Sequence, residues 1–196
     1  MGIFAEKKVC EYVNDLAAKS SVPGGGSAAA LNAAIGVALN LMVINHTIKS
    51  KVRSPENSEL LLMKTTQEKS LEYLVKLIDD DCAGFLKLMD AIKQKIADDV
   101  LYKSAAEAPF NVMRETSSAL EITLLLKDIG NKNLISDVVC AYHSLKCGFY
   151  SALANVKINI KHFENKKTAK LAFDEIKDLV SKVEGISEEF FVGTNE

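Results

Sequence analysis

Helix-breaking residues are scarce in this chain, and their scarcity constrains its fold more than any other feature. The 196 residues include ten glycines and three prolines, and three of the glycines stand together at Gly24-Gly25-Gly26. Between the breakers, apolar residues recur at steps of three and four, which is the spacing of one helix face. No alternation typical of strands appears. The sequence therefore predicts an all-α protein.

The spacing predicts a single domain, residues 1–196, built as a bundle of about six or more helices, two of them long. Connections of a few residues favour antiparallel neighbours, so we expect an up-and-down arrangement. Residues 98–107 are predicted as a connector or short helix, and Pro109 suits the first turn of the helix after it. The predicted helices cover about Ile3–Lys19, Ser27–Lys49, Glu56–Ile96, Pro109–Ile129, Leu134–Lys161 and Lys166–Val183.

Charge and composition exclude several kinds of partner. The net charge is −2 and both signs are mixed along the chain, so there is no basic cluster for a nucleic acid or a membrane surface. The first 19 residues carry charges throughout, unlike a signal peptide. We therefore expect a cytoplasmic protein that binds neither nucleic acid nor membrane.

One stretch, Ala28 to Asn45, has no charged residue and imitates a membrane span. It contains Asn32, Asn40 and Asn45, whose amides would need hydrogen-bond partners that lipid does not supply. We interpret it as a helix buried at the centre of the bundle.

Metal and cysteine chemistry have little support in the sequence. The three histidines have no metal-ligand spacing, and no ExxH or HExxH pair occurs. Cys10, Cys82, Cys140 and Cys147 form no CxxC pair, so buried reduced thiols are the favoured interpretation.

The first candidate site is the loop Gly24-Gly25-Gly26-Ser27, which leads into a helix. Glycines let a ligand approach the backbone closely, and the helix N-terminus behind them offers free N–H groups. A tight turn with Ser27 as the helix cap explains the same residues. Taken alone, the loop leaves both interpretations open.

The second candidate is Asp81, which falls on the inward apolar stripe of its helix between Ile78 and Phe85. Its neighbours Asp79 and Asp80 fall off the stripe. A carboxylate held among apolar side chains loses solvation, so its pKa rises and it can exchange a proton near neutral pH. The alternative is a helix break at these acids, with all three in solvent.

The third candidate is a stripe of small and polar residues on the helix from Leu134, which includes Asp137 and Asn155. Such a stripe either packs closely on another helix or lines a polar cavity. The turn before this helix adds Asn131 and Asn133, although both are common turn residues.

These residues together resemble one known family, the cyclodeaminase/cyclohydrolase family that includes the C-terminal domain of formiminotransferase-cyclodeaminase. Four features agree in order and span nearly the whole chain. They are Val22-Pro23-Gly24-Gly25-Gly26-Ser27 with the helix that ends Met42-Val43-Ile44-Asn45-His46-Thr47, then Asp81-Cys82-Ala83-Gly84-Phe85, then Gly130-Asn131-Lys132-Asn133 with Ser136-Asp137, and then Asn155-Val156-Lys157-Ile158-Asn159.

The resemblance implies an all-helical homodimer that acts on a tetrahydrofolate derivative, possibly polyglutamylated, with no metal and no cofactor beyond that substrate. It places the family's acid/base carboxylate at Asp81. It places the folate-binding region at Gly24, Gly25, Gly26, Ser27, Asn45, Asn131, Asn133, Ser136, Asp137 and Asn155.

Three functions follow as hypotheses. The first is cyclodeamination, which forms 5,10-methenyl-tetrahydrofolate and ammonia from 5-formimino-tetrahydrofolate, with Asp81 as proton donor and acceptor. The second is the cyclohydrolase reaction, in which water opens methenyl-tetrahydrofolate to 10-formyl-tetrahydrofolate. The third is a helical binding or scaffolding protein without catalysis. The sequence does not separate the first two.

Overall fold

The structure is a computed structural model that describes residues 3–48 and 55–191, with the backbone alone at residues 55 and 56. The described residues form α-helices and one short 3₁₀ helix, and they contain no strand. The all-α prediction is confirmed. The elements are α1 Val9–Ala17, α2 Gly25–Thr47, α3 Pro55–Gln94, α4 Asp99–Ile129, η1 Lys132–Leu134, α5 Ile135–Ile160 and α6 Lys166–Phe191.

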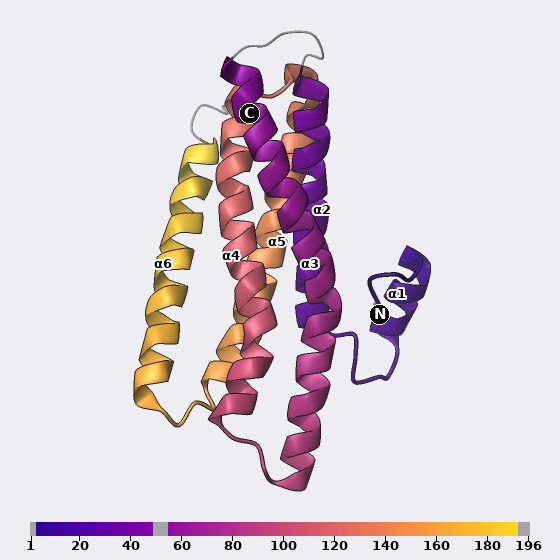
Figure 1. Cartoon of the computed structure of the whole chain (residues 1–196), viewed down its shortest axis with the longest axis vertical. Helices are drawn as coiled ribbons and strands as arrows, with labels where there is room; N and C mark the ends of the chain where they lie inside the picture. The colour runs from indigo at the N-terminus through magenta and orange to yellow at the C-terminus, as the bar shows by residue number, and fades with distance from the viewer. Residues whose placement is uncertain (1–2, 49–54, 192–196) are drawn as a thin grey trace.

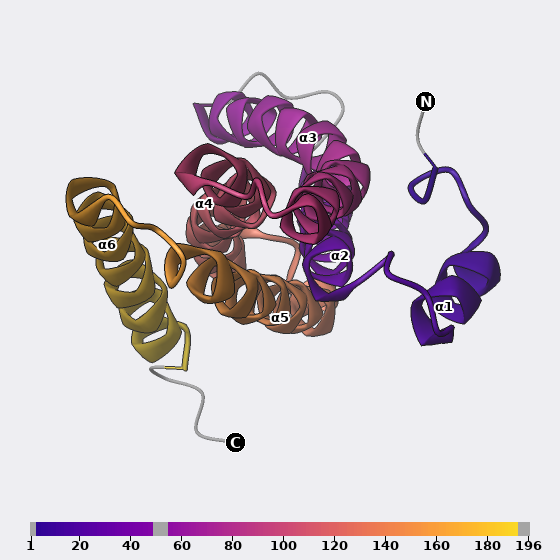
Figure 2. The ribbon, with the colours of Figure 1, turned by 90° about the horizontal axis from the view of Figure 1, so that it is seen from below.

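Helices α2, α3, α4 and α5 form the bundle, and α1 and α6 lie on opposite sides of it (Figure 1). Seen along the long axis, α2 packs among α3, α4 and α5, while α6 lies against α4 and α1 stands to the side of α2 (Figure 2). The four central helices therefore carry the core, and α2 is its centre.

Small residues let α2 and α5 approach closely. A Cβ built at Gly36 would lie 2.6 Å from a Leu145 side-chain carbon, and one at Gly148 would lie 3.0 Å from the Ala29 carbonyl oxygen. Of the two explanations for the small stripe on α5, close helix packing is confirmed for its middle part.

α2 is buried along most of its inner face, as the uncharged sequence predicts. Among the described residues it is the one helix long and apolar enough to cross a membrane. Its three asparagines differ in surroundings, since Asn40 is fully buried, Asn32 half-buried and Asn45 exposed.

A group of buried polar side chains joins three helices at the middle of the bundle. The Asn40 amide nitrogen donates to the Gln67 oxygen at 3.0 Å and to the Ala119 carbonyl at 3.2 Å. The Thr123 hydroxyl lies 3.1 Å from the Asn40 amide oxygen, to which it donates. The Asn40 amide thus finds partners for its nitrogen and its oxygen within the core, which is what burial of a polar group requires.

The first helix differs from its prediction. It begins at Val9 instead of Ile3, and two apolar residues that share its face are exposed, Val9 at 78% and Val13 at 53%. Tyr12, at the edge of the same stripe, is 4% exposed and packs against the core of the bundle. The apolar spacing identified a helix face but not what covers it.

The fourth helix also begins earlier than predicted. The Asp98 carboxylate accepts a hydrogen bond from the Leu101 N–H at 2.9 Å and caps a helix that starts at Asp99. Pro109 therefore lies inside α4 and not in its first turn. Gly130 ends this helix, as predicted.

Other elements can be compared with the prediction. α3 is one continuous helix, as predicted, whereas α6 extends beyond the predicted Val183 to Phe191. Phe173 of α6 is 50% exposed. Cys82 is buried, but Cys10, Cys140 and Cys147 are exposed, so the prediction of buried thiols fails for three of the four. The predicted end of the second helix at Lys49 lies outside the described residues.

Candidate active site

The start of α2 and the middle of α3 meet at Gly26 and Asp81. A Cβ built on Gly26 would lie 2.0 Å from a carboxylate oxygen of Asp81, so no other residue fits at position 26 without displacing that side chain. The Ser27 backbone N–H donates a hydrogen bond to the same carboxylate. Gly26 therefore lets the acid of α3 reach the N-terminal end of α2.

The position of Ser27 excludes it as the helix cap that the tight-turn explanation assumed. Gly24 is the N-cap residue of α2, and Ser27 lies within the first turn with its side chain fully buried. Ser27 is therefore not the cap. Its backbone supplies one of the N–H groups that helix ends leave without an intrahelical partner, and a carboxylate receives it.

Asp81 is an unusually weak acid for an aspartate side chain. Burial raises its pKa to about 6 from an ordinary 3.8, and the Ser27 N–H opposes part of that rise. The desolvation expected from its place on the inward stripe is present, and α3 does not break at the three acids. A carboxyl group with this pKa exists in both protonation states near neutral pH, as proton transfer requires.

Two nearby groups do not titrate near neutrality. Burial raises the pKa of the Cys82 thiol to about 11 and raises the pKa of the Tyr12 phenol above its ordinary 10. Both groups therefore remain protonated where Asp81 changes charge, so Asp81 is the acid/base candidate of this cluster.

Asp81 opens into a cavity of about 240 Å³. Its walls come from the segment before α2, the glycines, and the facing parts of α3, α4 and α5. This volume is below the roughly 300–1,000 Å³ of whole-ligand pockets, so it suits one end of a larger molecule. The cavity is lined by Ser21, Val22, Gly24, Gly25, Gly26, Asp81, Phe85, Ala105, Asn155 and Asn159.

Two asparagines of α5 face this cavity. The Asn155 amide nitrogen donates to the Ser151 carbonyl at 2.9 Å, and the Asn159 amide nitrogen donates to the Asn155 carbonyl at 3.1 Å. With both nitrogens engaged inside α5, each amide oxygen can accept a hydrogen bond from a ligand. The polar-cavity interpretation of the α5 stripe therefore holds at this end.

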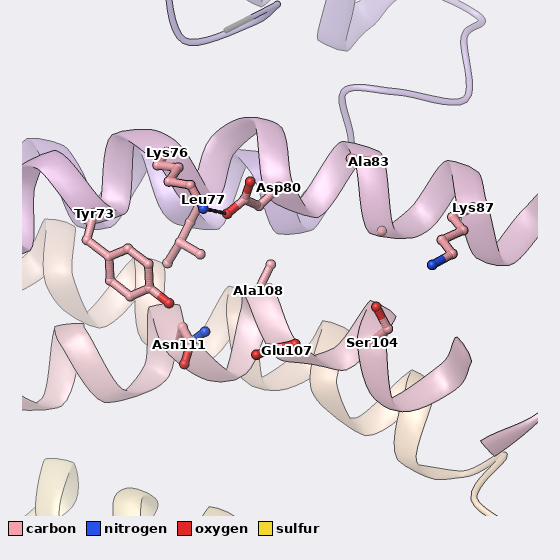
Figure 3. Close-up of a pocket in the computed structure, with 11 residues that line it drawn as sticks. Tyr73, Lys76, Leu77, Asp80, Ala83, Lys87, Ser104, Glu107, Ala108 and Asn111 are labelled. Carbon is pink, nitrogen blue, oxygen red and sulfur yellow. Dashed lines mark hydrogen bonds and ion pairs between the residues drawn. The ribbon is translucent and has the colours of Figure 1, made fainter. Parts of the chain in front are cut away.

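The two acids before Asp81 have different surroundings. The Asp79 carboxylate accepts hydrogen bonds from the backbone N–H groups of Ile3, Phe4 and Ala5 at 3.1, 2.7 and 3.4 Å. Asp80 pairs with Lys76 at 2.7 Å beside a cavity of about 410 Å³ between α3 and α4 (Figure 3). The three consecutive acids therefore lie in three different environments, and the environment of Asp81 is the desolvated one.

The remaining predicted site residues lie at the other end of the bundle. Asn45 is exposed near the end of α2, and the Asn131 N–H donates to the Thr47 hydroxyl at 2.9 Å. Asp137 and Asn155 are separated by about 27 Å along α5, at a rise of about 1.5 Å per residue. Within one chain the structure brings Asp81, Gly24, Gly25, Gly26, Ser27 and Asn155 together, and it places Asn45, Asn131, Asn133, Ser136 and Asp137 elsewhere.

Asn131 also has a structural role in its turn. Its side-chain oxygen accepts a hydrogen bond from the Asn133 N–H at 3.1 Å, which is the arrangement expected of a turn residue. Asn133 and Ser136 are exposed and Asp137 is half-buried.

Sequence reasoning missed Tyr12, whose hydroxyl lies 3.0 Å from the Ser27 hydroxyl in a buried contact. Tyr12 stands three residues after Val9 and four before Leu16, so it borders the apolar stripe of its helix. An aromatic residue at that position was the available signal, because a tyrosine buries an apolar ring while its hydroxyl finds a polar partner.

No group of three or more histidine, cysteine, aspartate or glutamate side chains is placed to hold a metal ion within residues 3–48 and 55–191.

Comparison with known proteins gives consistent matches. The model of the formiminotransferase-cyclodeaminase family matches residues 8–178. The methenyltetrahydrofolate cyclohydrolase of Methylorubrum extorquens is 28% identical over 92% of both chains. The mouse formimidoyltransferase-cyclodeaminase is 28% identical over 76% of this chain, which corresponds to 30% of the mouse protein. The crystal structure of a Thermotoga maritima formiminotetrahydrofolate cyclodeaminase superposes with a TM-score of 0.88 and 26% identity, covering 95% of this chain and 94% of that one.

Proposed function

Since the chain belongs to the formiminotransferase-cyclodeaminase family of folate one-carbon enzymes, we propose that it is a cyclodeaminase in which Asp81 transfers the proton. The observation that carries the proposal is a carboxyl group with a pKa of about 6 in the wall of a cavity, at the start of a helix. Its protonation state changes in the range where an acid/base catalyst is most effective.

The chemistry needs one proton to move between two nitrogens. In protonated 5-formimino-tetrahydrofolate, N10 attacks the formimino carbon and forms a tetrahedral centre. Asp81 accepts the N10 proton and delivers it to the exocyclic nitrogen, which leaves as ammonia as the N5–C–N10 amidinium forms. The product carries a positive charge, which a nearby carboxylate stabilises. The small cavity holds the reacting end of the folate and fixes the approach of N10.

A second reaction, the cyclohydrolase reaction, has its own support. The Methylorubrum extorquens relative that matches along 92% of both chains carries that name. In that direction Asp81 takes a proton from the water that attacks the methenyl carbon and returns it to N5 as the C–N5 bond breaks. The hydroxyl left on the carbon loses its proton to solvent, and 10-formyl-tetrahydrofolate results. Both reactions use the same proton-transfer group and the same cationic carbon.

Purified protein separates these reactions when it is given 5-formimino-tetrahydrofolate or methenyl-tetrahydrofolate and followed by ultraviolet absorbance. The proposal expects methenyl-tetrahydrofolate to accumulate from the first substrate. Consumption of the second substrate alone would replace cyclodeamination with the cyclohydrolase reaction. No change with either substrate, in protein that melts cooperatively, contradicts both.

The role of Asp81 is tested with Asp81→Asn, which should lower the rate by roughly a hundredfold or more, the typical contribution of a proton-transfer group. Asp80→Asn is the matched control, because that neighbouring acid is paired with Lys76 on another face of α3. The wild-type rate should rise with pH through about 6, since the carboxylate form accepts the first proton. Equal rates for the Asp81→Asn protein and the wild type would contradict the assignment.

We also propose a homodimer, in which an antiparallel second copy places Asp137 and its neighbours beside the Asp81 cavity. Exposed and uncharged positions on the neighbouring helices α2 and α5 support it, among them Ile35 at 46% and Ile158 at 59% exposure. Mixing the variants Asp81→Asn and Asp137→Asn should then restore about a quarter of wild-type activity, from one intact site per mixed dimer. No recovery on mixing, or a monomer by light scattering, contradicts this arrangement.

A further inference from the structure

The N-terminal segment is attached to the bundle beside Asp81 through hydrogen bonds and through Tyr12, Phe4 and Ala5, which pack against the core. The backbone N–H groups of residues 3–5 bind Asp79, two residues before Asp81 on α3. The apolar face of α1 does not pack on the bundle, because Val9 and Val13 are exposed. Both views show α1 to the side of the bundle next to α2 (Figures 1 and 2). The segment therefore contacts the neighbourhood of Asp81 although the exposed apolar residues of α1 do not pack on the bundle.

The deepest of these contacts is the hydroxyl of Tyr12. Its ring is 4% exposed and stands edge-on to Phe4, with 6.5 Å between ring centroids. The hydroxyl lies 3.0 Å from the Ser27 hydroxyl, and Ser27 has no exposed surface. The Ser27 hydroxyl also shares a hydrogen bond with the Cys82 thiol. A buried hydroxyl between two partners has little freedom to rotate, so Tyr12 fixes the orientation of Ser27.

The same serine meets Asp81 through its backbone N–H, beside Gly26, where an added Cβ would lie 2.0 Å from a carboxylate oxygen. Two groups of Ser27 therefore connect Tyr12 on α1 to Asp81 on α3, the hydroxyl on one side and the backbone N–H on the other. Because both groups belong to one residue, a displacement of Ser27 changes both contacts. The Tyr12 phenol does not face the reacting centre, since it is absent from the residues that line the cavity.

We propose that Tyr12 is a positioning residue for Asp81, acting through Ser27 to hold the carboxylate in its place at the cavity wall. The inference rests on the proposed function for its kinetic effect, but the link between Tyr12 and Asp81 exists whatever the reaction is. It assigns a role to the N-terminal segment that the folate-binding motifs do not include.

The titratable groups around Asp81 are few, so its pKa can report the link. Asp79 and Cys82 accompany it on α3, and Tyr12 is the titratable group contributed by α1. α2 contributes the Ser27 N–H. α4 and α5 contribute Ala105, Asn155 and Asn159 to the cavity wall, none of which titrates. A change in hydrogen bonding at Ser27 should therefore appear most directly as a change in the pKa of Asp81.

The test compares Tyr12→Phe, Ser27→Ala and the double variant. Tyr12→Phe keeps the ring and removes the hydroxyl, so Ser27 is held less firmly and its N–H bond to the carboxylate weakens. That bond favours the charged form, so the pKa of Asp81 should rise by about half a unit to one unit. The value of kcat should fall about tenfold with little change in KM, as expected for a misplaced catalytic group.

The matched control is Tyr142→Phe on α5. Tyr142 is also a buried tyrosine, but its hydroxyl has no hydrogen-bond partner among the described residues. Removing that hydroxyl should leave kcat and the pKa of Asp81 unchanged. If Tyr142→Phe produces the same shift as Tyr12→Phe, the effect is a general loosening of the bundle and the proposal is wrong.

The double variant shows whether Tyr12 and Ser27 act as one unit. If they do, Tyr12→Phe/Ser27→Ala changes kcat and the pKa of Asp81 no more than the larger single variant does. Effects on kcat that multiply fully would overturn the proposal. Ser27→Ala removes the same contact from the other side, so it decides the question alone if Tyr12→Phe fails to fold.

The pKa of Asp81 is measured by nuclear magnetic resonance of ¹³C-labelled aspartate carboxyl groups, which needs no activity. If the wild-type protein is inactive on both folates and Tyr12→Phe still shifts the pKa of Asp81, the link is supported and the proposed function is contradicted. An active Tyr12→Phe enzyme with unchanged kcat and unchanged Asp81 pKa contradicts the link and leaves the proposed function intact.

Discussion

Two groups of polar side chains inside the bundle, one at its centre and one at the start of α2, differ in how completely they are partnered. At the centre, Asn40, Gln67 and Thr123 join α2, α3 and α4 through neutral hydrogen bonds of 3.0–3.2 Å. At the N-terminus of α2, the ionisable Asp81 carboxylate accepts a hydrogen bond from the Ser27 N–H. No ion pair joins this carboxylate to a cation within the described part of the chain. The central group has its hydrogen-bond partners inside the protein, whereas the Asp81 carboxylate can still accept hydrogen bonds from a ligand in the cavity.

The difference shows what each polar group contributes. A neutral group with all its partners fixes how the helices pack, and its loss leaves buried atoms unpaired. A desolvated carboxylate opposes folding in its charged form, because burial raises its pKa. We interpret the first as structural and the second as functional. The following substitutions should therefore separate stability from activity.

The largest effect is expected from Asn40→Ala. It leaves the buried Gln67 and Thr123 without their shared partner and opens a small cavity, so the free energy of unfolding should fall by about 3–5 kcal/mol. Activity per folded molecule should stay near wild type, because Asn40 does not line the Asp81 cavity. Urea unfolding and a rate assay on the folded fraction check both statements. Lost activity with unchanged stability would reverse the assignment.

The next effect is expected from Gly26→Ala. The added Cβ would stand 2.0 Å from an Asp81 carboxylate oxygen, so the side chain must move. We expect activity to fall about a hundredfold, as when a catalytic group is displaced by about 1 Å. Gly185→Ala on α6 is the control, because a Cβ at Gly185 meets no atom within 4 Å and Gly185 does not line the Asp81 cavity. Equal rates in the two variants would show that the contact between Gly26 and Asp81 has no functional importance.

A smaller effect, of opposite sign, is expected on the stability of Asp81→Asn. The folded-state pKa of about 6 lies above the ordinary 3.8, so the folded state binds more protons between these values and wild-type stability falls as pH rises through this window. Above pH 6 the variant should be more stable by about 1–3 kcal/mol, and below pH 3.8 the two proteins should converge. Melting curves across this range check the sign. A variant less stable than wild type above pH 6 would contradict the desolvation of Asp81.

The sequence predicted the helices that form the core well, because their apolar spacing is long and regular. The same spacing identified Asp81, since it places the acid one turn after Ile78, which is buried. Phe85, predicted to lie on the same inward stripe, is 40% exposed and lines the cavity. Gly26 was predicted as part of a loop open to a ligand, whereas the group that approaches it most closely is the carboxylate of Asp81.

Other features depend on contacts that spacing does not encode. Val9 and Val13 are exposed and do not pack on the bundle. Tyr12 points inward, where its hydroxyl contacts the Ser27 hydroxyl. Pro109 was placed at a helix start, but the Asp98 cap begins that helix ten residues earlier, at Asp99. Local rules give the period of a helix, whereas tertiary packing decides its orientation and its ends.

The central claim is that Asp81 is a desolvated acid, and a pH titration of its own carboxyl carbon tests this most directly. The ¹³C resonance is assigned as the signal that disappears in Asp81→Asn, and its shift is followed across the acidic and neutral range. The structure predicts a midpoint of about 6. A midpoint near the ordinary aspartate value of 3.8 would mean that water reaches the carboxylate freely, and proton transfer by Asp81 would lose its physical basis.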